Sequence, residues 1–285
     1  MAKNNKENEV DTSESGAPAG GRAIRDMFST DEIFHRITAT AEEEFSRSDR
    51  LLFWSGLAAG LSMGLTFVAR STFTGALPYD YSGLLGNLLY PLGFLLIVLG
   101  RYQLFTENTL TPVTLVLTRL TNLPVLLRLW GVVLFANLFG SSIMAFILAN
   151  TGIFDADATA AAIKFGEHAV ELSWWDLFWK AVIAGWIVAS MVWLIHAARD
   201  MTARFITVYV LMFMIPSADL FHCIIASCEM FFVVFKGVVE WYEYGRVVSA
   251  VIVGNTVGGV LLVAILNHAQ VQEERLPKGE KEKIE

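Results

Sequence analysis

The sequence predicts an all-α integral membrane protein in which six transmembrane helices form two inverted three-helix repeats, with the second and fifth helices broken. Three observations lead to this prediction. Hydrophobic residues make up 54% of the 285-residue chain and its mean hydropathy is +0.51, a composition too apolar for an ordinary soluble domain. The apolar residues gather in six long segments. Two of these segments are interrupted by polar residues, and the two interruptions resemble each other.

Four of the six segments can cross a bilayer as continuous helices, because a transmembrane helix needs about 20 mostly apolar residues. They are Leu51–Val68, Leu129–Leu148, Leu177–Ile195 and Val247–Leu266. The second segment in the chain, Leu84–Leu117, is broken between Arg101 and Asn108, and the fifth, Phe205–Val234, is broken at Pro216–Asp219. Non-helical backbone is tolerated at membrane depth only where it is buried in protein or lines a wet cavity. The two breaks therefore predict a pathway through the protein.

The two halves of the chain repeat a short pattern. Leu104-Phe105-Thr106 in the second segment matches Leu220-Phe221-His222 in the fifth. Asn137 lies 31 residues after the end of the first triplet, and Asn255 lies 33 residues after the end of the second. Because three spans are repeated, the halves enter the membrane in opposite senses, and paired broken helices then place a site near the midplane.

The chain outside the spans predicts two tails and a surface helix. Apolar residues recur every four positions from Ile33 to Phe45, which predicts an amphipathic helix at the membrane surface or, alternatively, a helical lead-in to the first span. Lys and Arg concentrate on the side of both termini, so both termini are predicted to be cytoplasmic. The resulting parts are a disordered tail (1–30), an amphipathic cytoplasmic helix (31–50), a six-span domain (51–267) and a charged tail (268–285).

Composition and motifs exclude several other classes of protein. The net charge is −7 and no long basic patch occurs, so we expect no nucleic-acid partner. Gly60–Gly64 matches the G-x-S-x-G pattern of serine hydrolases, but it lies inside a continuous apolar helix rather than at a strand-to-helix turn. His222, Cys223 and Cys228 lack metal-ligand spacing, since adjacent helical side chains point about 100° apart. We therefore expect no enzyme, no metal site and no cofactor.

His222 directly follows the second break. An ionisable residue inside a membrane span generally indicates a functional site. The alternative interpretation of His222 is a neutral histidine that is hydrogen-bonded in the protein core. We favour function, because the break, the repeat and the histidine coincide. The ring could attract an arriving anion, or give it a proton so that a neutral acid crosses an apolar constriction. Three charged residues near the breaks, Arg101, Glu107 and Asp219, are candidates for an electrostatic role, and we expect Arg101 and Glu107 to pair.

Three stretches together resemble the formate/nitrite transporter family: LFTEN at Leu104–Asn108, the broken fifth segment ending in His222, and GNTVGG at Gly254–Gly259. The resemblance covers residues 31–267. It implies an aquaporin-like fold in a homopentamer, with one pore in each protomer, as a multi-pass protein of the bacterial inner (plasma) membrane. It also implies channel-like transport of small monovalent anions such as formate, nitrite or a short monocarboxylate, with proton coupling through the central histidine.

The resemblance also assigns expected roles to individual residues. Thr106 would hydrogen-bond His222 at the centre of the substrate pathway, and Asn255 matches the asparagine of the family's sixth span. Six further residues would form apolar constrictions along the pathway: Tyr90, Phe94, Leu104, Phe105, Val188 and Ile215.

The resemblance is incomplete at three positions near the family's pore. Ala169 stands where the family has a lysine, Gly185 where it has an asparagine, and Phe221 where it has a glutamate. These departures predict a divergent pore lining. The sequence therefore also fits a membrane scaffold or sensor that keeps the fold without conduction.

Overall fold

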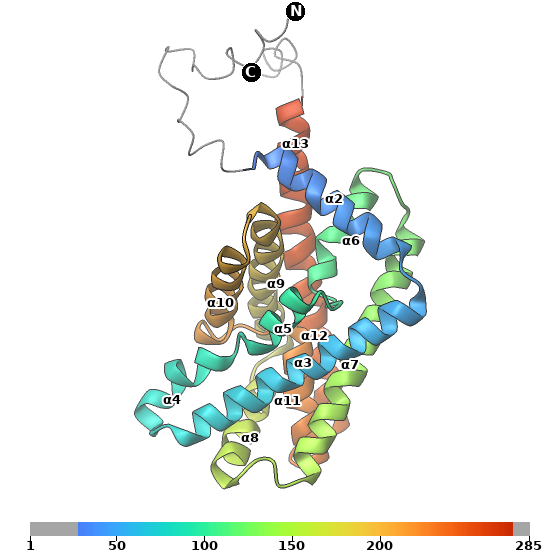
Figure 1. Ribbon diagram of the computed structural model, residues 1–285. Helices are drawn as coiled ribbons and strands as arrows, with labels where there is room; N and C mark the ends of the chain where they lie inside the picture. The colour runs from blue at the N-terminus through green and yellow to red at the C-terminus, as the bar shows by residue number, and fades with distance from the viewer. Residues whose placement is uncertain (1–27, 276–285) are drawn as a thin grey trace, which may run out of the picture.

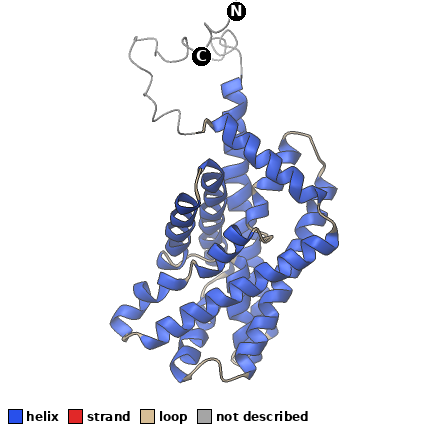
Figure 2. Cartoon of the chain, in the orientation of Figure 1, coloured by secondary structure: helices blue, strands red, loops and turns tan. Residues whose placement is uncertain are grey.

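The computed structural model describes residues 28–275, and these residues contain helices and no strand (Figure 1, Figure 2). The predicted disordered tail lies almost wholly outside the described residues, as do the last ten residues of the predicted charged tail. In chain order the elements are α2 (Thr30–Ser46), α3 (Asp49–Ala76), α4 (Tyr79–Gly86), η1 (Asn87–Leu89), α5 (Leu92–Gly100), η2 (Glu107–Thr109), α6 (Thr111–Leu117), α7 (Leu123–Asn150), α8 (Ala156–Glu171), α9 (Trp174–Ala197), α10 (Met201–Ser217), α11 (Cys223–Phe235), α12 (Trp241–Gly259), the π-helical η3 (Val260–Ile265) and α13 (Leu266–Arg275).

The six predicted spans are all present. Helices α3, α7 and α9 are continuous, the second span runs from α4 to α6, the fifth consists of α10 and α11, and the sixth combines α12 with η3. Within the described part of the chain, four stretches are long and apolar enough to cross a membrane: Asp49–Ala76, Gly83–Gly100, Leu123–Asn150 and Trp174–Ala197. Helices α10 and α11 are shorter and apolar. The breaks thus fall in the second and fifth spans, as the sequence predicts.

Each break contains a residue with left-handed backbone geometry. Helix α5 ends at Arg101 with a φ of 57°, and the chain after α10 turns at Asp219 with a φ of 53°. Residues with a Cβ adopt positive φ rarely, but a single left-handed residue is a common way to end a helix. The polar residues of the two interruptions therefore occupy turns that stop one half-helix and redirect the chain to the next.

The long helices pack as two close pairs, α3 with α7 and α9 with α12. A Cβ at Gly60 of α3 would overlap the carbonyl oxygen of Asn137, and a Cβ at Gly185 of α9 would overlap the carbonyl oxygen of Asn255. Glycine lets helix backbones approach each other closely in membrane proteins. The same backbone contact thus occurs once in each half of the repeat.

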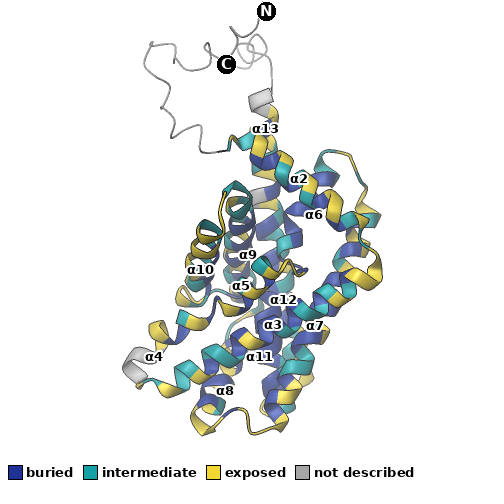
Figure 3. Ribbon diagram, in the orientation of Figure 1, coloured by how far each residue is buried: buried dark blue, intermediate teal, exposed yellow. Residues whose placement is uncertain are grey.

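Helix α2 is a separate helix that crosses one end of the bundle (Figure 1). Its buried face includes Ile33, Ile37 and Ala41 and packs on α6, α9 and α13, while its other face is largely exposed (Figure 3). Ser48 caps the start of α3 by accepting a hydrogen bond from the backbone N–H of Leu51. Helix α2 is therefore separate from the first span and does not continue into it.

Two helices go beyond the predicted elements. Helix α8, which packs on α3 and α11, lies between the third and fourth predicted spans. Asp155 caps it by accepting a hydrogen bond from the backbone N–H of Ala158, and its alanine-rich sequence favours a helix. Helix α13 continues the sixth span as far as Arg275, so the first part of the predicted charged tail is helical.

Candidate functional site

Asn137 of α7 fixes the backbone of the first break. Its Oδ1 accepts a hydrogen bond of 2.8 Å from the N–H of Phe105. Its Nδ2 donates to the carbonyl oxygens of Gln103 and Gly56, at 2.9 and 2.8 Å. Unpaired backbone groups are costly away from water, and an interrupted helix creates them. The asparagine therefore satisfies the groups that the break exposes and ties the loop to α3 and α7.

Asn255 of α12 does the same for the second break. Its Oδ1 accepts a hydrogen bond of 2.8 Å from the N–H of Cys223, the first residue of α11. Its Nδ2 donates to the carbonyl oxygens of Phe221 and Ala181, at 3.0 and 2.8 Å. His222 lies between the two bonded residues, so Asn255 positions the backbone on both sides of the histidine. This contact is to backbone, and Asn255 has no hydrogen bond to the imidazole.

These bonds correct the register of the predicted repeat. Each asparagine bonds the residues 32 and 34 positions before it. Leu104 of the first break is therefore the structural equivalent of His222, whereas the letter pattern matched Thr106 with His222. The register of the repeat is set by the backbone groups that the two asparagines bond. The similarity between the triplets ending in Thr106 and His222 does not determine it, because Thr106 lies two residues after the true equivalent, Leu104.

Thr106 and His222 meet where the two breaks face each other. A hydrogen bond of 2.7 Å joins Thr106 Oγ1 and His222 Nε2, and both side chains are buried. The second ring nitrogen, Nδ1, is also buried and has no hydrogen-bond partner within the described residues. A buried polar atom left unpaired costs free energy. The imidazole therefore offers one nitrogen to the protein and one to a water or solute.

Aromatic rings surround the imidazole. Phe94 of α5 lies edge-on to His222 with ring centroids 4.9 Å apart, and Tyr90 contacts Phe94 at 5.8 Å. Phe105 packs against Trp130 of α7 with ring centroids 5.7 Å apart, so its ring contact is with α7 rather than with His222. The remaining predicted constriction residues, Leu104, Val188 and Ile215, are fully buried in the same hydrophobic core.

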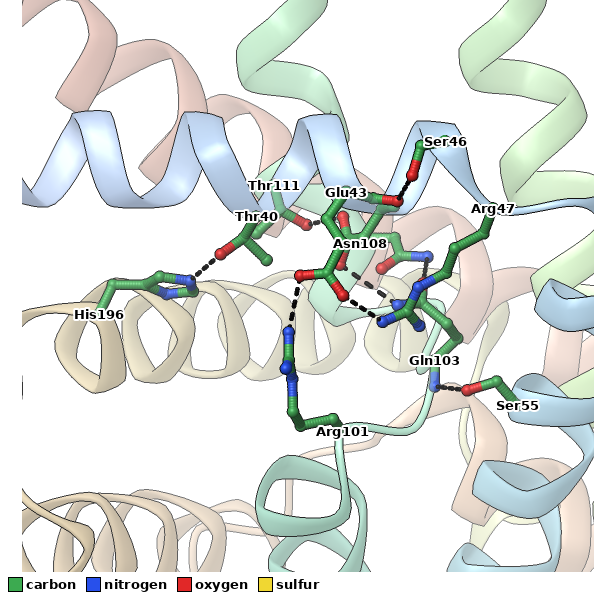
Figure 4. Close-up of polar contacts among 11 residues, drawn as sticks. Thr40, Glu43, Ser46, Arg47, Ser55, Arg101, Gln103, Asn108, Thr111 and His196 are labelled. Carbon is green, nitrogen blue, oxygen red and sulfur yellow. Dashed lines mark hydrogen bonds and ion pairs between the residues drawn. The ribbon is translucent and has the colours of Figure 1, made fainter.

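A large polar chamber lies between α2 and the bundle, and we call it the α2 chamber. Its volume is about 480 Å³. Its charged and titratable lining residues include Arg36, Arg47, Arg101, Arg204, Glu43, Glu44, Glu107 and His196. Figure 4 shows its hydrogen-bonded network, in which Glu43 binds Arg47 and Arg101 while His196 binds Thr40.

The expected pair between Arg101 and Glu107 does not form. Arg101 Nη2 lies 2.7 Å from Glu43 Oε2 on α2. The left-handed backbone at Arg101 turns its side chain outward, where it is 69% exposed, whereas Glu107 is carried inward by η2. Glu107 Oε1 is buried and has no hydrogen-bond partner within the described residues. Arg101 therefore connects the second span to α2.

Glu44 of α2 is a buried carboxyl group at the edge of the same chamber. It accepts hydrogen bonds from Thr111 Oγ1 at 2.7 Å and from Gln103 Nε2 at 3.4 Å. Burial raises the pKa of Glu44 to about 7, and the two hydrogen bonds oppose this rise only in part. The carboxyl group that attaches α2 to the loop and to α6 is thus titratable near neutral pH.

A second chamber, which we call the His222 chamber, adjoins the central histidine. Its volume is about 40 Å³, and its polar lining residues include Arg70, Tyr90, His168, Asp219, His222 and Glu229. Asp219 pairs with His168 at 2.8 Å and with Lys180. Arg70 Nη1 lies 2.9 Å from Glu229 Oε1, with side-chain exposures of 16% and 5%. Charged groups therefore lie within one small chamber beside the imidazole.

The Arg70–Glu229 pair was not predicted from the sequence. The predicted first span ends at Val68, whereas α3 extends to Ala76 and keeps Arg70 inside the helix. Glu229 lies in the apolar run of the fifth span. An ionisable residue in such a run is itself a signal of function, so Glu229 could have been found from the sequence, but its partner could not.

The three positions that depart from the family pattern have defined surroundings. Ala169 is buried in α8. Gly185 packs on the backbone of Asn255. Phe221 stacks on His168 with ring centroids 6.1 Å apart.

No group of three or more His, Cys, Asp or Glu residues suited to a metal ion occurs in residues that the structure describes.

The chain is similar in sequence and fold to several known proteins. A family model described as formate/nitrite transporter matches residues 31–269. The chain is 34% identical over 254 residues to the inner membrane protein YfdC of Escherichia coli (strain K12), covering 88% of this chain and 81% of that protein. It is 28% identical over 198 residues to a probable formate transporter of Methanothermobacter thermautotrophicus, covering 62% and 71%.

Two solved structures share the fold. An FNT family ion channel superimposes with a TM-score of 0.74 at 18% identity, covering 84% of this chain and 98% of the channel. A pentameric formate channel with formate bound superimposes with a TM-score of 0.61 at 24% identity, covering 82% and 98%. At these identities the likeness establishes the helical membrane-channel fold.

Proposed function

The chain belongs to the formate/nitrite transporter family, and from this premise we propose that it conducts small monovalent anions, such as formate, nitrite or a short monocarboxylate, in a channel-like manner. The observation that carries the proposal is the hydrogen bond between Thr106 and His222 at the meeting point of the two breaks. The family is one of transporters, so the enzyme alternative is set aside.

His222 is proposed to act on the anion through its unpaired nitrogen. An anion beside the ring stabilises the imidazolium form by charge attraction. Transfer of one proton from the ring to a carboxylate oxygen then leaves a neutral imidazole and a neutral acid. Moving the neutral acid past Phe94 and Leu104 costs less than moving its anion, because an unpaired charge is expensive to bury. Thr106 holds the ring in the orientation that this exchange requires.

The α2 chamber is proposed to be the entrance vestibule of the pathway. It is lined by four arginines and three glutamates. Protonation of Glu44 near neutral pH removes one negative charge, so the excess of positive over negative charge increases. A cleft with an excess of one charge raises the local concentration of the opposite ion. The chamber therefore gathers anions before they enter the narrow path.

Assembly and orientation are further parts of the proposal. The pentameric formate channel that shares the fold supports a homopentamer with one pore in each protomer. The distribution of Lys and Arg supports cytoplasmic termini, which puts the α2 chamber on the cytoplasmic side of a bacterial inner membrane. Native mass spectrometry of the detergent-purified protein tests the pentamer, and protease access to the termini in membrane vesicles tests the orientation.

Flux measurements test the transport proposal. The purified protein is reconstituted in liposomes and offered formate, nitrite, acetate or lactate across a pH gradient. We expect uptake of at least one of these anions, and we expect His222→Ala to abolish it. His35→Ala is the matched control, because His35 lies on α2 with its side chain 65% exposed. The absence of flux for every solute would favour the scaffold or sensor alternative, and equal flux in the His222→Ala variant would remove the histidine from the mechanism.

A further inference from the structure

The Arg70–Glu229 ion pair and the central histidine line the same chamber, and neither Arg70 nor Glu229 was among the site residues predicted from the sequence. Glu229 is on α11, six residues beyond its first residue, which is about 9 Å along a helix axis. Arg70, Glu229 and His222 all line the His222 chamber. An anion in this chamber is therefore within reach of both the guanidinium and the imidazole.

The guanidinium of Arg70 is held firmly in place. Its Nε donates to Asn87 Oδ1 at 3.1 Å and its Nη1 donates to Glu229 Oε1 at 2.9 Å. Its planar face lies over the ring of Phe165, 3.8 Å from the centroid. These contacts leave Nη2 without a hydrogen-bond partner among the residues described. A guanidinium fixed in this way presents its remaining N–H groups in one plane, which is the geometry that a carboxylate prefers.

The size of the His222 chamber limits what can bind. Each water-sized atom needs about 10–15 Å³ of such volume, so about 40 Å³ accommodates about three atoms. Formate and nitrite each have three non-hydrogen atoms. Lactate has twice as many, which exceeds this volume. The chamber therefore suits a small planar monovalent anion.

Glu229 moderates the attraction of Arg70 for an anion. A lone buried guanidinium would hold an anion tightly, but conduction requires binding that is weak enough for the ion to leave. The neighbouring charged groups contribute little net charge, because Asp219 is paired with Lys180 and His168. The Arg70–Glu229 pair is thus the main electrostatic feature among the residues that line the chamber with His222.

We propose that Arg70 is the anion-binding residue of a subsite in the His222 chamber, that Glu229 weakens this binding as its counter-ion, and that the subsite selects three-atom monovalent anions such as formate and nitrite. The proposal rests on the proposed function of the pathway. It also accounts for the absence of a lysine at Ala169, since Arg70 on α3 places a cation in the chamber from a different helix.

The two partners of the pair are expected to act in opposite directions. Arg70→Gln removes the binding group, so the half-saturating formate concentration should rise about tenfold. Glu229→Gln frees Arg70 from its counter-ion, so the same quantity should fall by about the same factor. Both factors correspond to the gain or loss of about one charge-assisted hydrogen bond. A purely structural ion pair predicts instead that both variants change in the same direction, because each leaves one buried charge unpaired.

The experiment measures formate binding and formate flux separately. Binding to the detergent-purified assembly is followed by saturation-transfer NMR, and flux is followed in liposomes. Glu243→Gln is the matched control, because Glu243 is an ion-paired carboxylate on α12 that does not line the chamber, and we expect it to leave both quantities unchanged. The double variant Arg70→Gln/Glu229→Gln avoids a buried unpaired charge, so it should assemble normally and bind as weakly as Arg70→Gln.

The outcomes separate the subsite from the transport proposal. Opposite shifts in formate binding support the subsite even if the wild type shows no flux, in which case only the transport proposal fails. Shifts of the two single variants in the same direction, or unchanged binding in the double variant, overturn the subsite even if flux is normal. Glu229→Gln should favour formate and nitrite but not lactate, and an equal gain for lactate would overturn the proposed size selection.

Discussion

Glu44 is expected to make the attachment of α2 to the bundle dependent on pH. The carboxyl group is buried against Thr111 and Gln103, and burial raises its pKa from 4.5 to about 7. The docked state therefore binds the proton more tightly than the detached state, in which the group returns to its ordinary pKa. Docking is fully stabilised by this group below pH 4.5, and the stabilisation is lost as the pH rises from 4.5 to about 7.

The magnitude follows from the two pKa values. A difference of one pKa unit corresponds to about 1.4 kcal/mol, and the part of the shift that is expressed between pH 5 and pH 8 amounts to about 2.5 kcal/mol. This free energy corresponds to a change of about seventyfold in the equilibrium between docked and detached α2. In Glu44→Gln the side chain stays neutral, so the dependence on pH should disappear and α2 should stay docked at pH 8.

Hydrogen-exchange mass spectrometry of the detergent-purified protein measures this change. The amides of α2 around the buried Ile37 and Ala41 should be less protected at pH 8 than at pH 5, after correction for intrinsic exchange rates. Glu42→Gln is the control, because Glu42 is the exposed neighbour two positions from Glu44 and its removal should leave the pH dependence unchanged. Protection that does not vary with pH in the wild type, or that varies equally in Glu44→Gln, would refute the reasoning.

Three further substitutions probe the site and its supports. Thr106→Val removes the hydroxyl that orients the imidazole, so anion flux in liposomes should fall about two- to tenfold while the assembly stays intact; unchanged flux would show that the hydroxyl is dispensable. Gly185→Asn places the family's usual residue on α9, and it should lower the free energy of unfolding by about 2 kcal/mol or more because the side chain overlaps the backbone of Asn255. Thermal unfolding should show this loss. The control Gly131→Ala, which has open space at the Cβ, should be neutral or stabilising. Asn255→Leu removes the hydrogen bonds of the side chain to one N–H and two carbonyl groups, so the melting temperature should drop by an amount equivalent to about 3 kcal/mol or more. A wild-type melting temperature would contradict the assigned role of the asparagine.

The candidate site was partly predictable because its parts are marked by local sequence signals. Polar residues interrupt apolar runs at Arg101–Asn108 and Pro216–Asp219, and a histidine follows the second interruption. Those signals identify the loops, and the resemblance to a known family supplied the expected contact between Thr106 and His222. The contact is present at 2.7 Å. Its role in transport stays a prediction until flux is measured.

Other features of the site depend on contacts that no local signal contains. Arg70 and Glu229 are 159 residues apart in the chain, and they meet because α3 packs on α11. Arg101 was expected to pair within its own loop, yet it reaches Glu43 across 58 residues. In both cases the partner depends on which helix faces meet and how each helix is rotated about its axis.

The sequence alone determined that this protein crosses the membrane six times, that two of the spans are broken and where the breaks lie. Hydropathy and helix interruption are local properties, because each segment must satisfy its own backbone in an apolar medium. Only the tertiary structure decided the register of the repeat, in which two asparagines bond the loops and make Leu104 the counterpart of His222. It also decided which charged groups share a chamber with the histidine, since that depends on the packing of helices far apart in the chain.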